Sequence, residues 1–243
     1  MSKVAIVTGG SRGIGAATAK LLGTKGYAVC VNYFANRDRA NNVVDTIVRN
    51  GGRAFACQAD VSSEADVIRL FDAAEERLGE VTHLVNNAGI LFTQSKLVDI
   101  DLKRFNQVLN SNVVSCFLCS REAVRRFPAG SAIVNVSSLA SQTGSPFEYV
   151  DYAASKGAMD TLTKGLSREV AGSGIRVNAV RPGFIYTDMH ADGGEPGRVG
   201  RLAPQIPMQR GGSAEEVANT IAWLLSDEAS YVTGSFIDVA GGR

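Results

Sequence analysis

The sequence of 243 residues has little excess charge of either sign and no long apolar run. Its 25 basic and 24 acidic side chains leave a formal net charge of +1, which gives no support for a nucleic-acid or membrane-surface partner. No stretch approaches the roughly 18 apolar residues of a membrane-spanning helix. The apolar run at 4–7 is too short for a secretory signal, and glycines follow it at once. We therefore expect a cytoplasmic protein with neither nucleic-acid nor membrane partners.

Soft metal ligands are also scarce, because the chain has only four cysteines and two histidines. Cys116 and Cys119 have the C-x-x-C spacing of redox and metal sites, but they lie in an apolar run without a second pair of ligands. Cys30 and Cys57 lie in strand-like apolar runs and have the character of small buried side chains. We predict no metal site and a buried structural role for Cys116 and Cys119; a redox or metal pair is the alternative.

What the chain does have is a regular alternation of apolar strands and helical patterns. Strands are predicted at 4–7, 28–33, 54–58, 83–86, 132–136, 175–180 and 235–239, and helices at 13–25, 38–50, 64–78, 102–127, 151–172 and 214–226. Strands that are apolar throughout and separated by helices are typical of a parallel sheet covered on both faces. The prediction is an α/β protein: one Rossmann domain over residues 1–243, doubly wound, with a seven-stranded parallel sheet.

The least regular part of the chain is 188–213, which is rich in Gly, Pro and Arg. Ligands of open α/β sheets bind beyond the carboxyl ends of the strands, and long loops there are more often functional than decorative. We expect this segment to be a substrate lid.

A glycine-rich turn follows the first predicted strand, where residues 8–15 read Thr-Gly-Gly-Ser-Arg-Gly-Ile-Gly. Such a turn exposes backbone N–H groups and a helix N-terminus to a phosphate. The spacing G-x-x-x-G-x-G differs from the common dinucleotide fingerprint G-x-G-x-x-G. A turn without a ligand is the alternative, which the position directly after the first strand disfavours.

The end of the second strand bears on the choice of cofactor. Residues 31–37 read Val-Asn-Tyr-Phe-Ala-Asn-Arg, with no acid before Asp38. An acid at this point takes the ribose 2′-OH of NAD, whereas a basic residue accommodates the 2′-phosphate of NADP. Arg12 and Arg37 are candidates for that phosphate, because a guanidinium binds phosphate in a fork geometry; solvated surface charges are the alternative. We favour NADP(H) over NAD(H).

Tyr152 and Lys156 are four residues apart on a predicted helix, so they share one face. A nearby cation favours the phenolate of a tyrosine, whose unperturbed pKa is about 10. A tyrosine that exchanges a proton near neutral pH suits the interconversion of a carbonyl and an alcohol. By itself the pair is weak, because this spacing also arises by chance.

The glycine turn, Asn-Asn-Ala-Gly at 86–89, Val-Ser-Ser at 136–138 and the Tyr152–Lys156 pair occur in this order. With them the chain resembles the short-chain dehydrogenase/reductase family over residues 4–242. Within the family it is most similar to bacterial enzymes such as 3-oxoacyl-carrier-protein reductase and glucose 1-dehydrogenase. The resemblance implies four catalytic residues: Asn112, Ser138, Tyr152 and Lys156. If the alignment were shifted, the neighbouring Ser137 and Tyr149 would take the catalytic positions instead.

The resemblance also implies a role for each catalytic residue. Tyr152 protonates the developing alkoxide, with its pKa drawn toward the operating pH. Lys156 stabilises the phenolate and binds the nicotinamide ribose, and Ser138 donates to the substrate oxygen. Asn112 holds a water that links Lys156 to solvent.

A cofactor-binding set follows from the same resemblance. Asp60 and Val61 receive the adenine, and the loop at 182–187 holds the carboxamide through the backbone of Ile185 and through Thr187. A capping role in the turn is the alternative for Asp60. The complete predicted set is Gly9, Ser11, Arg12, Gly13, Ile14, Gly15, Asn32, Arg37, Asp60, Val61, Asn87, Ala88, Gly89, Tyr152, Lys156, Pro182, Gly183, Ile185 and Thr187.

The substrate stays open between a small carbonyl or alcohol and the same group on a carrier. Arg198 and Arg201 are candidates for an acidic substrate and His190 for a hydroxylated one, with a solvated surface as the alternative. Three arginines of one helix face are candidates for docking an acidic carrier protein, again against a solvated surface: Arg121, Arg125 and Arg126.

The resemblance and the small-residue helix after Tyr152 predict a homotetramer. The function predicted is an NADP(H)-dependent oxidoreductase that interconverts a carbonyl and a secondary alcohol. More specific alternatives are a 3-oxoacyl-carrier-protein reductase and a glucose 1-dehydrogenase. A non-catalytic nucleotide-binding regulatory protein is the alternative from another class.

Overall fold

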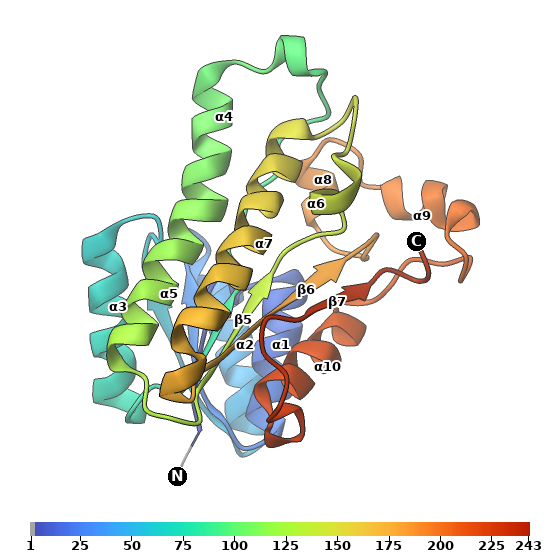
Figure 1. Ribbon diagram of the computed structural model, residues 1–243. Coiled ribbons are helices and arrows are strands. Elements are labelled where there is room, and N and C mark those ends of the chain that lie inside the picture. The colour runs from blue at the N-terminus through green and yellow to red at the C-terminus, as the bar shows by residue number, and fades with distance from the viewer. Residues whose placement is uncertain (1–2) are drawn as a thin grey trace.

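A parallel sheet of seven strands forms the centre of the computed structural model, which describes residues 3–243 (Figure 1). The spatial order is β3-β2-β1-β4-β5-β6-β7, and every neighbouring pair is parallel. The strands are β1 (Val4–Val7), β2 (Ala28–Tyr33), β3 (Arg53–Gln58), β4 (His83–Asn86), β5 (Ala132–Val136), β6 (Arg176–Pro182) and β7 (Phe236–Val239). The strand order reverses between β1 and β4, which is the point where doubly wound folds bind nucleotides. The predicted fold class is confirmed.

Long helices cover both faces of the sheet. One face carries α1 (Gly13–Thr24), α2 (Arg37–Arg49) and α10 (Ala214–Leu225), and the other carries α3 (Glu64–Leu78), α5 (Ser115–Arg126) and α7 (Val150–Val170). The remaining helical segments are α4 (Leu102–Leu109), α6 (Ala140–Thr143), α8 (Met189–Asp192), α9 (Arg198–Leu202), the π-helical η2 (Asn110–Val114), and the 3-10 turns η1 (Leu97–Asp99), η3 (Ala171–Ser173), η4 (Ala203–Gln205) and η5 (Asp227–Ala229). Figure 1 shows α6, α8 and α9 on the side toward which β5, β6 and β7 point.

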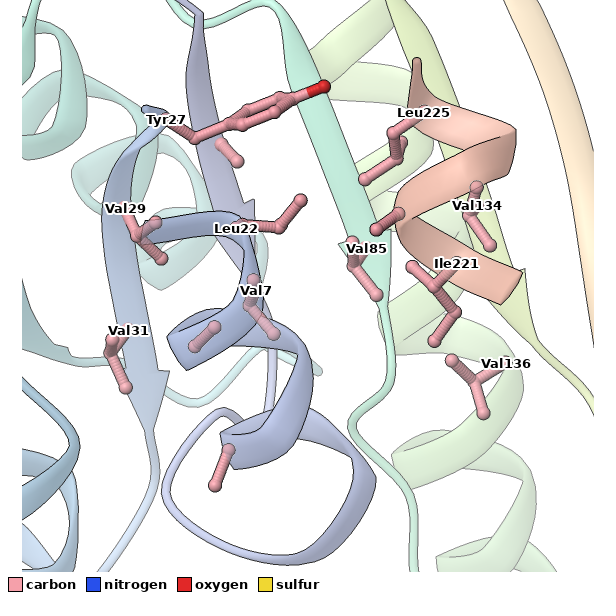
Figure 2. Close-up of a cluster of buried hydrophobic side chains, with 14 of the residues drawn as sticks. Val7, Leu22, Tyr27, Val29, Val31, Val85, Val134, Val136, Ile221 and Leu225 are labelled. Carbon is pink, nitrogen blue, oxygen red and sulfur yellow. The ribbon is translucent and has the colours of Figure 1, made fainter. Parts of the chain in front are cut away.

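Each face of the sheet has its own apolar core. Figure 2 shows the core beneath α1 and α10, where Leu22 and Ile221 pack above strand residues such as Val7 and Val85. These four side chains are completely buried. Because both faces of β1, β2, β4 and β5 are covered, their residues are buried without alternation, as the apolar runs predict.

The helix predicted at 102–127 is interrupted. Between α4 and α5 the backbone widens into η2, and the N–H of Ser115 donates to the carbonyl of Asn110, five residues earlier. The hydroxyl of Ser115 donates to the carbonyl of Ser111 at 2.7 Å. Single-turn π segments inside α-helices occur frequently at functional sites, and this one contains Asn112.

The 188–213 segment is more ordered than a loop, because it contains α8, α9 and η4. A short parallel bridge between Ile185 and Gly212 joins the two ends of the segment. Tyr186 N–H donates to Gly212 O and Gly212 N–H donates to Phe184 O, each at 2.9 Å. The segment therefore leaves and re-enters the body of the protein at one place.

Within residues 3–243, no helix combines the length and apolarity needed to cross a membrane. Cys116 and Cys119 are free and buried, and burial raises the pKa of the Cys116 thiol to about 12. A buried place for both cysteines is confirmed. Cys57, in contrast, is only half-buried.

Candidate active site

The turn between β1 and α1 is shaped by glycine. Gly9 and Gly13 have φ values of +60° and +53°, in the left-handed region that glycine tolerates best. A Cβ on Gly15 would lie 2.4 Å from the carbonyl oxygen of Gly9 and 2.5 Å from Nδ2 of Asn87. The first turn of α1 contains no acid. The turn therefore presents uncapped helical N–H groups next to β4, which is a geometry that binds phosphate.

Thr8 ties the ends of β1 and β4 together. Its buried hydroxyl accepts hydrogen bonds from the backbone N–H groups of Asn87 and Ala88, both at 3.0 Å. Asn87 Nδ2 donates in return to the carbonyls of Thr8 and Gly9, at 2.9 and 3.1 Å. These bonds fix the Asn-Asn-Ala-Gly stretch against the glycine turn at the switch point of the sheet.

A cleft of about 740 Å³ runs along this edge of the sheet. Most of the predicted cofactor residues line it: Gly9, Ser11, Arg12, Gly13, Ile14, Asn32, Asp60, Val61, Asn87, Ala88, Gly89 and Thr187. The lining does not include Gly15, Arg37, Tyr152, Lys156, Pro182, Gly183 or Ile185. Gly15 shapes the turn, whereas Pro182 and Gly183 lie at the base of the 188–213 segment, where Gly183 N–H donates to Val239 O at 3.0 Å.

Arg39, not Arg37, is the arginine of α2 that reaches the cleft wall. The helix begins at Arg37, and Asn36 caps it by accepting the N–H of Arg39 at 3.0 Å. Arg37 is exposed and does not line the cleft, so its contact with the cofactor stays a prediction. The signal that could have identified Arg39 is Asn36, because an N-cap fixes where the helix starts and hence which residues share its first turn.

Two other polar residues of the cleft wall have side chains already used by the protein. Asn32 is buried, and its Nδ2 donates to the carbonyls of Cys57 and Ala59 while its Oδ1 accepts the N–H of Gly9. Oδ1 of Asp60 accepts the N–H and hydroxyl of Ser62, at 2.9 and 2.6 Å. Asn32 therefore holds three strand ends in place, and Asp60 has the turn-capping contacts that were its alternative role.

Lys156 lies on α7 and is buried inside the protein. Within residues 3–243, its ammonium forms no ion pair with a carboxylate. Its Nζ donates to the carbonyl of Val136 at 2.7 Å, and lies 5.5 Å from the centre of the Tyr152 ring. A Cβ built on Gly89 of the cleft wall would lie 3.7 Å from Nζ. Burial lowers the pKa of Lys156 to about 8. An ammonium held close to the cleft and away from water binds acceptor groups strongly.

Tyr152 and Ser138 face one another across the end of β5. Tyr152 is half-buried; desolvation of its phenol raises the pKa to about 12, and the nearby Ser138 side chain opposes this shift. The expected downward shift from Lys156 is not found, because Lys156 is not among the groups that shift the pKa of Tyr152. The phenol is therefore protonated at neutral pH and able to donate.

The neighbouring candidates point elsewhere. The Ser137 hydroxyl donates to the carbonyl of Lys156 at 3.3 Å, and the Tyr149 hydroxyl contacts the carbonyl of Gly193 at 3.5 Å. Of the two serines, Ser138 is thus the one whose side chain meets Tyr152.

Asn112 is fully buried, and its side chain clamps the backbone of Ile90. Oδ1 accepts the N–H of Ile90 at 2.8 Å, while Nδ2 donates to the carbonyl of Ile90 at 3.2 Å and to the hydroxyl of Ser155 at 3.0 Å. Both amide protons are used, so the side chain positions the end of the cleft next to α7. Any water that Asn112 holds would have to bind its backbone or the remaining lone pair of Oδ1.

Sequence reasoning missed a buried ion pair behind Tyr152. Arg104 Nε donates to Asp151 Oδ2 at 2.7 Å, and Asp151 Oδ1 accepts the N–H of Tyr152 at 2.9 Å. Arg104 also donates to the carbonyl of Thr93 at 2.9 Å. The pair joins α4, α7 and the chain beyond β4. Because the ion pair links residues that are far apart in sequence, no local sequence pattern predicts it.

The arginines predicted to bind an acidic substrate are paired within the protein. Arg198 is 4% exposed and forms ion pairs with Glu148 and Glu195, and Arg201 pairs with Glu195 at 2.5 Å. His190 is half-buried and hydrogen-bonds through Nε2 to the carbonyl of Ile185 at 3.1 Å. These side chains build the 188–213 segment instead of presenting free charges to a ligand.

Comparisons with known proteins decide the family. The family described as "Enoyl-(Acyl carrier protein) reductase" matches residues 9–243. The chain is 62% identical to "Uncharacterized oxidoreductase YgfF" of Escherichia coli (strain K12), over 99% of each chain. It is 38% identical to "3-oxoacyl-[acyl-carrier-protein] reductase FabG" of Staphylococcus aureus (strain Mu50 / ATCC 700699), over 100% of this chain and 98% of that one.

The chain belongs to the short-chain dehydrogenase/reductase family. A solved short-chain dehydrogenase from Burkholderia cenocepacia J2315, in complex with NADP, superimposes with a TM-score of 0.92 at 36% identity, over 99% of this chain and 97% of that one. As a short-chain dehydrogenase/reductase, the protein is an NAD(P)-dependent oxidoreductase that acts on small molecules. The resemblance predicted from the sequence is confirmed.

Proposed function

We propose that this short-chain dehydrogenase/reductase uses NADP(H) to interconvert a carbonyl and a secondary alcohol, with Tyr152 as acid and base. The observation that carries the proposal is the meeting of the Tyr152 phenol, the Ser138 side chain and the buried Lys156 ammonium beside Gly89 of the cleft wall. A proton donor, a neutral hydrogen-bond donor and a fixed cation are the groups that a developing alkoxide requires.

The residues of the cleft fit a nicotinamide dinucleotide. The uncapped start of α1 suits the pyrophosphate, and Gly9 and Gly13 keep side chains away from it. Asp60 and Val61 line the other part of the cleft, where we place the adenine, and Thr187 lies against Gly13. The backbone at Ile185 and the Thr187 side chain would hold the carboxamide. When bound, the nicotinamide supplies or receives the hydride.

The chain's own residues move and hold the proton. The protonated Tyr152 donates from its hydroxyl to the substrate oxygen in the reductive direction, and Ser138 donates a second hydrogen bond to that oxygen. Lys156 carries the charge that stabilises the phenolate left behind. Asn112 acts through Ile90 and Ser155, which it holds in position, and its backbone is our candidate for a water that returns the proton.

Preference for NADP(H) is supported by the adenosine end of the cleft. Arg12 and Arg39 both line it, and the turn that follows β2 supplies no carboxylate to receive a 2′-hydroxyl. Asn32, at the end of β2, is committed to the backbone. The NADP complex of the similar Burkholderia enzyme agrees with this assignment.

The substrate we favour is a small free carbonyl compound. A 3-oxoacyl group on a carrier is the second candidate, because the Staphylococcus relative is named for that activity. The surface expected to dock a carrier is neutralised by acids: Arg126 pairs with Glu122, Asp72 and Glu75, and Arg121 pairs with Glu64. This pairing favours the free substrate. A glucose 1-dehydrogenase activity is a third, sugar-directed possibility that the same assay addresses.

We also propose that residues 1–243 form one domain, that the 188–213 segment closes over the substrate, and that the protein is a homotetramer. The exposed Phe117 of α5 supports helix-to-helix contact between copies. A monomer in analytical ultracentrifugation would contradict the last of these.

The test follows NADPH and NADH oxidation with a panel of free 3-oxoacyl esters, 3-oxoacyl thioesters and simple ketones, and NADP⁺ and NAD⁺ reduction with aldoses. We expect turnover that prefers NADPH and is lost in Tyr152→Phe, while that variant binds NADPH like the parent protein. Nucleotide binding without turnover on the whole panel would favour the non-catalytic regulatory alternative. Failure to bind either nucleotide would overturn the proposal.

A further inference from the structure

Two ion pairs join the 188–213 segment to the wall of the cofactor cleft. Nη2 of Arg12 lies 2.5 Å from Oδ2 of Asp192, and Nη1 of Arg39 lies 2.9 Å from Oδ2 of Asp188. Asp188 is the N-cap of α8 and Asp192 is its last residue; being four residues apart, they lie on one side of this helical turn. Each of the two cleft arginines therefore holds one carboxylate of the same short helix.

The two arginines separate two hollows of the surface. Both line the main cleft, and both line a second, more open groove between α1, α2 and the start of α10. Asp188 lines both hollows as well. The carboxylates of α8 thus approach the arginines at the border where a phosphate of the adenosine ribose would lie under the proposed function.

A 2′-phosphate and the two carboxylates cannot share these arginines without cost. A phosphate monoester carries nearly two negative charges near neutral pH, and like charges at contact distance repel strongly. The present ion pairs are half-exposed, with side chains 44% to 60% accessible, so each holds the segment only weakly. A dianion in fork contact with a guanidinium is the stronger partner.

We infer that Asp188 and Asp192 compete with the 2′-phosphate of the cofactor for Arg39 and Arg12, so that binding of a 2′-phosphorylated nucleotide releases α8 from the cleft wall. The inference rests on the proposed use of NADP(H). Under this inference, the two acids of the 188–213 segment weaken the binding of a 2′-phosphorylated cofactor, whereas the two arginines strengthen it. The competition also couples the adenosine end of the cleft to the segment proposed to cover the substrate.

The test uses nucleotide fragments that lack the nicotinamide, so that contacts at Thr187 do not obscure the result. Adenosine 2′,5′-bisphosphate and AMP are titrated by calorimetry into the parent protein, Asp188→Asn, Asp192→Asn and the double variant. We expect the ratio of the AMP Kd to the bisphosphate Kd to rise about two- to fivefold in each single variant. The double variant should show a rise larger than that of either single variant, and not their simple product, because the two acids share one helical turn and compete with one phosphate.

The matched control is Glu215→Gln. Glu215 lines the same outer groove and carries the same charge, but it forms no ion pair with the arginines in the part of the chain that is described. Its Kd ratio should equal that of the parent protein. An equal rise in this variant would reduce the effect to net charge and overturn the competition.

Hydrogen exchange of the backbone at 188–193 supplies an independent readout. At equal saturation, bisphosphate should speed exchange in this stretch relative to AMP, because it displaces both carboxylates. Slower exchange with bisphosphate would overturn the inference, as would unchanged Kd ratios in the asparagine variants. If the parent protein binds bisphosphate no better than AMP, the NADP preference itself fails; if it binds bisphosphate better and the variants match it, only the competition fails.

Discussion

The guanidinium of Arg104 and the carboxylate of Asp151 form a buried ion pair, in which Asp151 is 1% exposed and also receives the backbone N–H of Tyr152. The contact fixes the first turn of α7, which carries the proposed acid. Arg104 reaches from α4 and holds the carbonyl of Thr93 at the same time. The position of the Tyr152 backbone thus depends on a residue of another helix.

Removal of the arginine should be costly because it leaves a buried carboxylate without a partner. We expect Arg104→Ala to lower the free energy of unfolding by about 3–5 kcal/mol in urea denaturation. Arg121→Ala is the control, because the pair of Arg121 with Glu64 lies at the surface and should contribute no more than about 1 kcal/mol. Similar losses in both variants would show that the burial of Asp151 is unimportant. The double variant Arg104→Leu, Asp151→Asn should recover part of the lost stability.

The two adjacent serines provide a sharp comparison of function. Ser138→Ala removes the side chain that meets Tyr152 and should reduce kcat about 10²- to 10³-fold, as the loss of an oxyanion donor does. Ser137→Ala removes a hydroxyl that faces the carbonyl of Lys156, so its effect on kcat should be small. The measurement is steady-state NADPH oxidation with the best substrate of the panel. The opposite ranking of the two variants would reassign the donor.

The glycine turn should not tolerate a methyl group at Gly15. The added Cβ would lie 2.4 Å from Gly9 O, and a backbone atom cannot move aside cheaply. We expect Gly15→Ala to destabilise the protein by about 1–3 kcal/mol and to weaken NADPH binding in a fluorescence titration. Gly200→Ala on α9 meets no atom within 4 Å and should change stability by at most about 1 kcal/mol, in the stabilising direction. Normal NADPH binding by Gly15→Ala would contradict the proposed phosphate site.

His83 should make stability depend on pH. Burial, and then the positive charge of Lys3, lower its pKa to about 4, from about 6.5 in an unfolded chain. The unfolded state therefore binds more protons than the folded state in this range, so stability is lost as the pH falls from about 6.5 to about 4. We expect a loss of about 2 kcal/mol between pH 7 and pH 5. Urea unfolding of His83→Gln should show a shallower dependence on pH; an equal slope would exclude His83 as its origin.

Cys57 should react with thiol reagents before the other cysteines. A hydrogen bond from Cys30, together with Arg77 and Arg69, lowers the pKa of Cys57 to about 7, and its side chain is half-buried. Burial raises the pKa of Cys30, Cys116 and Cys119. At pH 7.5 we expect one fast phase of labelling, absent in Cys57→Ser and retained in Cys116→Ser. A fast phase that survives in Cys57→Ser would point to opening of the core.

The strands could be predicted to within about two residues, most directly β1, β2, β4 and β5, which are buried on both faces so that their apolar runs are continuous. The glycine turn, Asn87 and the Tyr152–Lys156 pair could be placed for a related reason. Their spacing within one turn or one helix already determines how they meet. Such features depend on local chain geometry, which can be predicted from the spacing of residues in the sequence.

The features that escaped prediction depend on contacts between distant segments. The π segment around Asn112 is stabilised by bonds to Ile90 and Ser155, which the sequence does not place nearby. Arg198 lies in a stretch whose sequence is typical of an exposed loop. It is nevertheless buried, because Glu148 and Glu195 both pair with it. The raised pKa of Tyr152 reflects its burial, which spacing alone does not reveal.

Every Asp, Glu and Arg of the 188–213 segment is engaged in an ion pair, within the segment or with the body of the protein, so the charges of the segment are neutralised. A ligand that approaches this part of the protein is therefore not drawn in by a strong local field, and the fit of its shape and apolar groups decides whether it is retained. Such a segment can change its choice of ligand through a few uncharged side chains while its ionic framework persists. This division leaves room for relatives of one architecture to diverge in the compounds they accept.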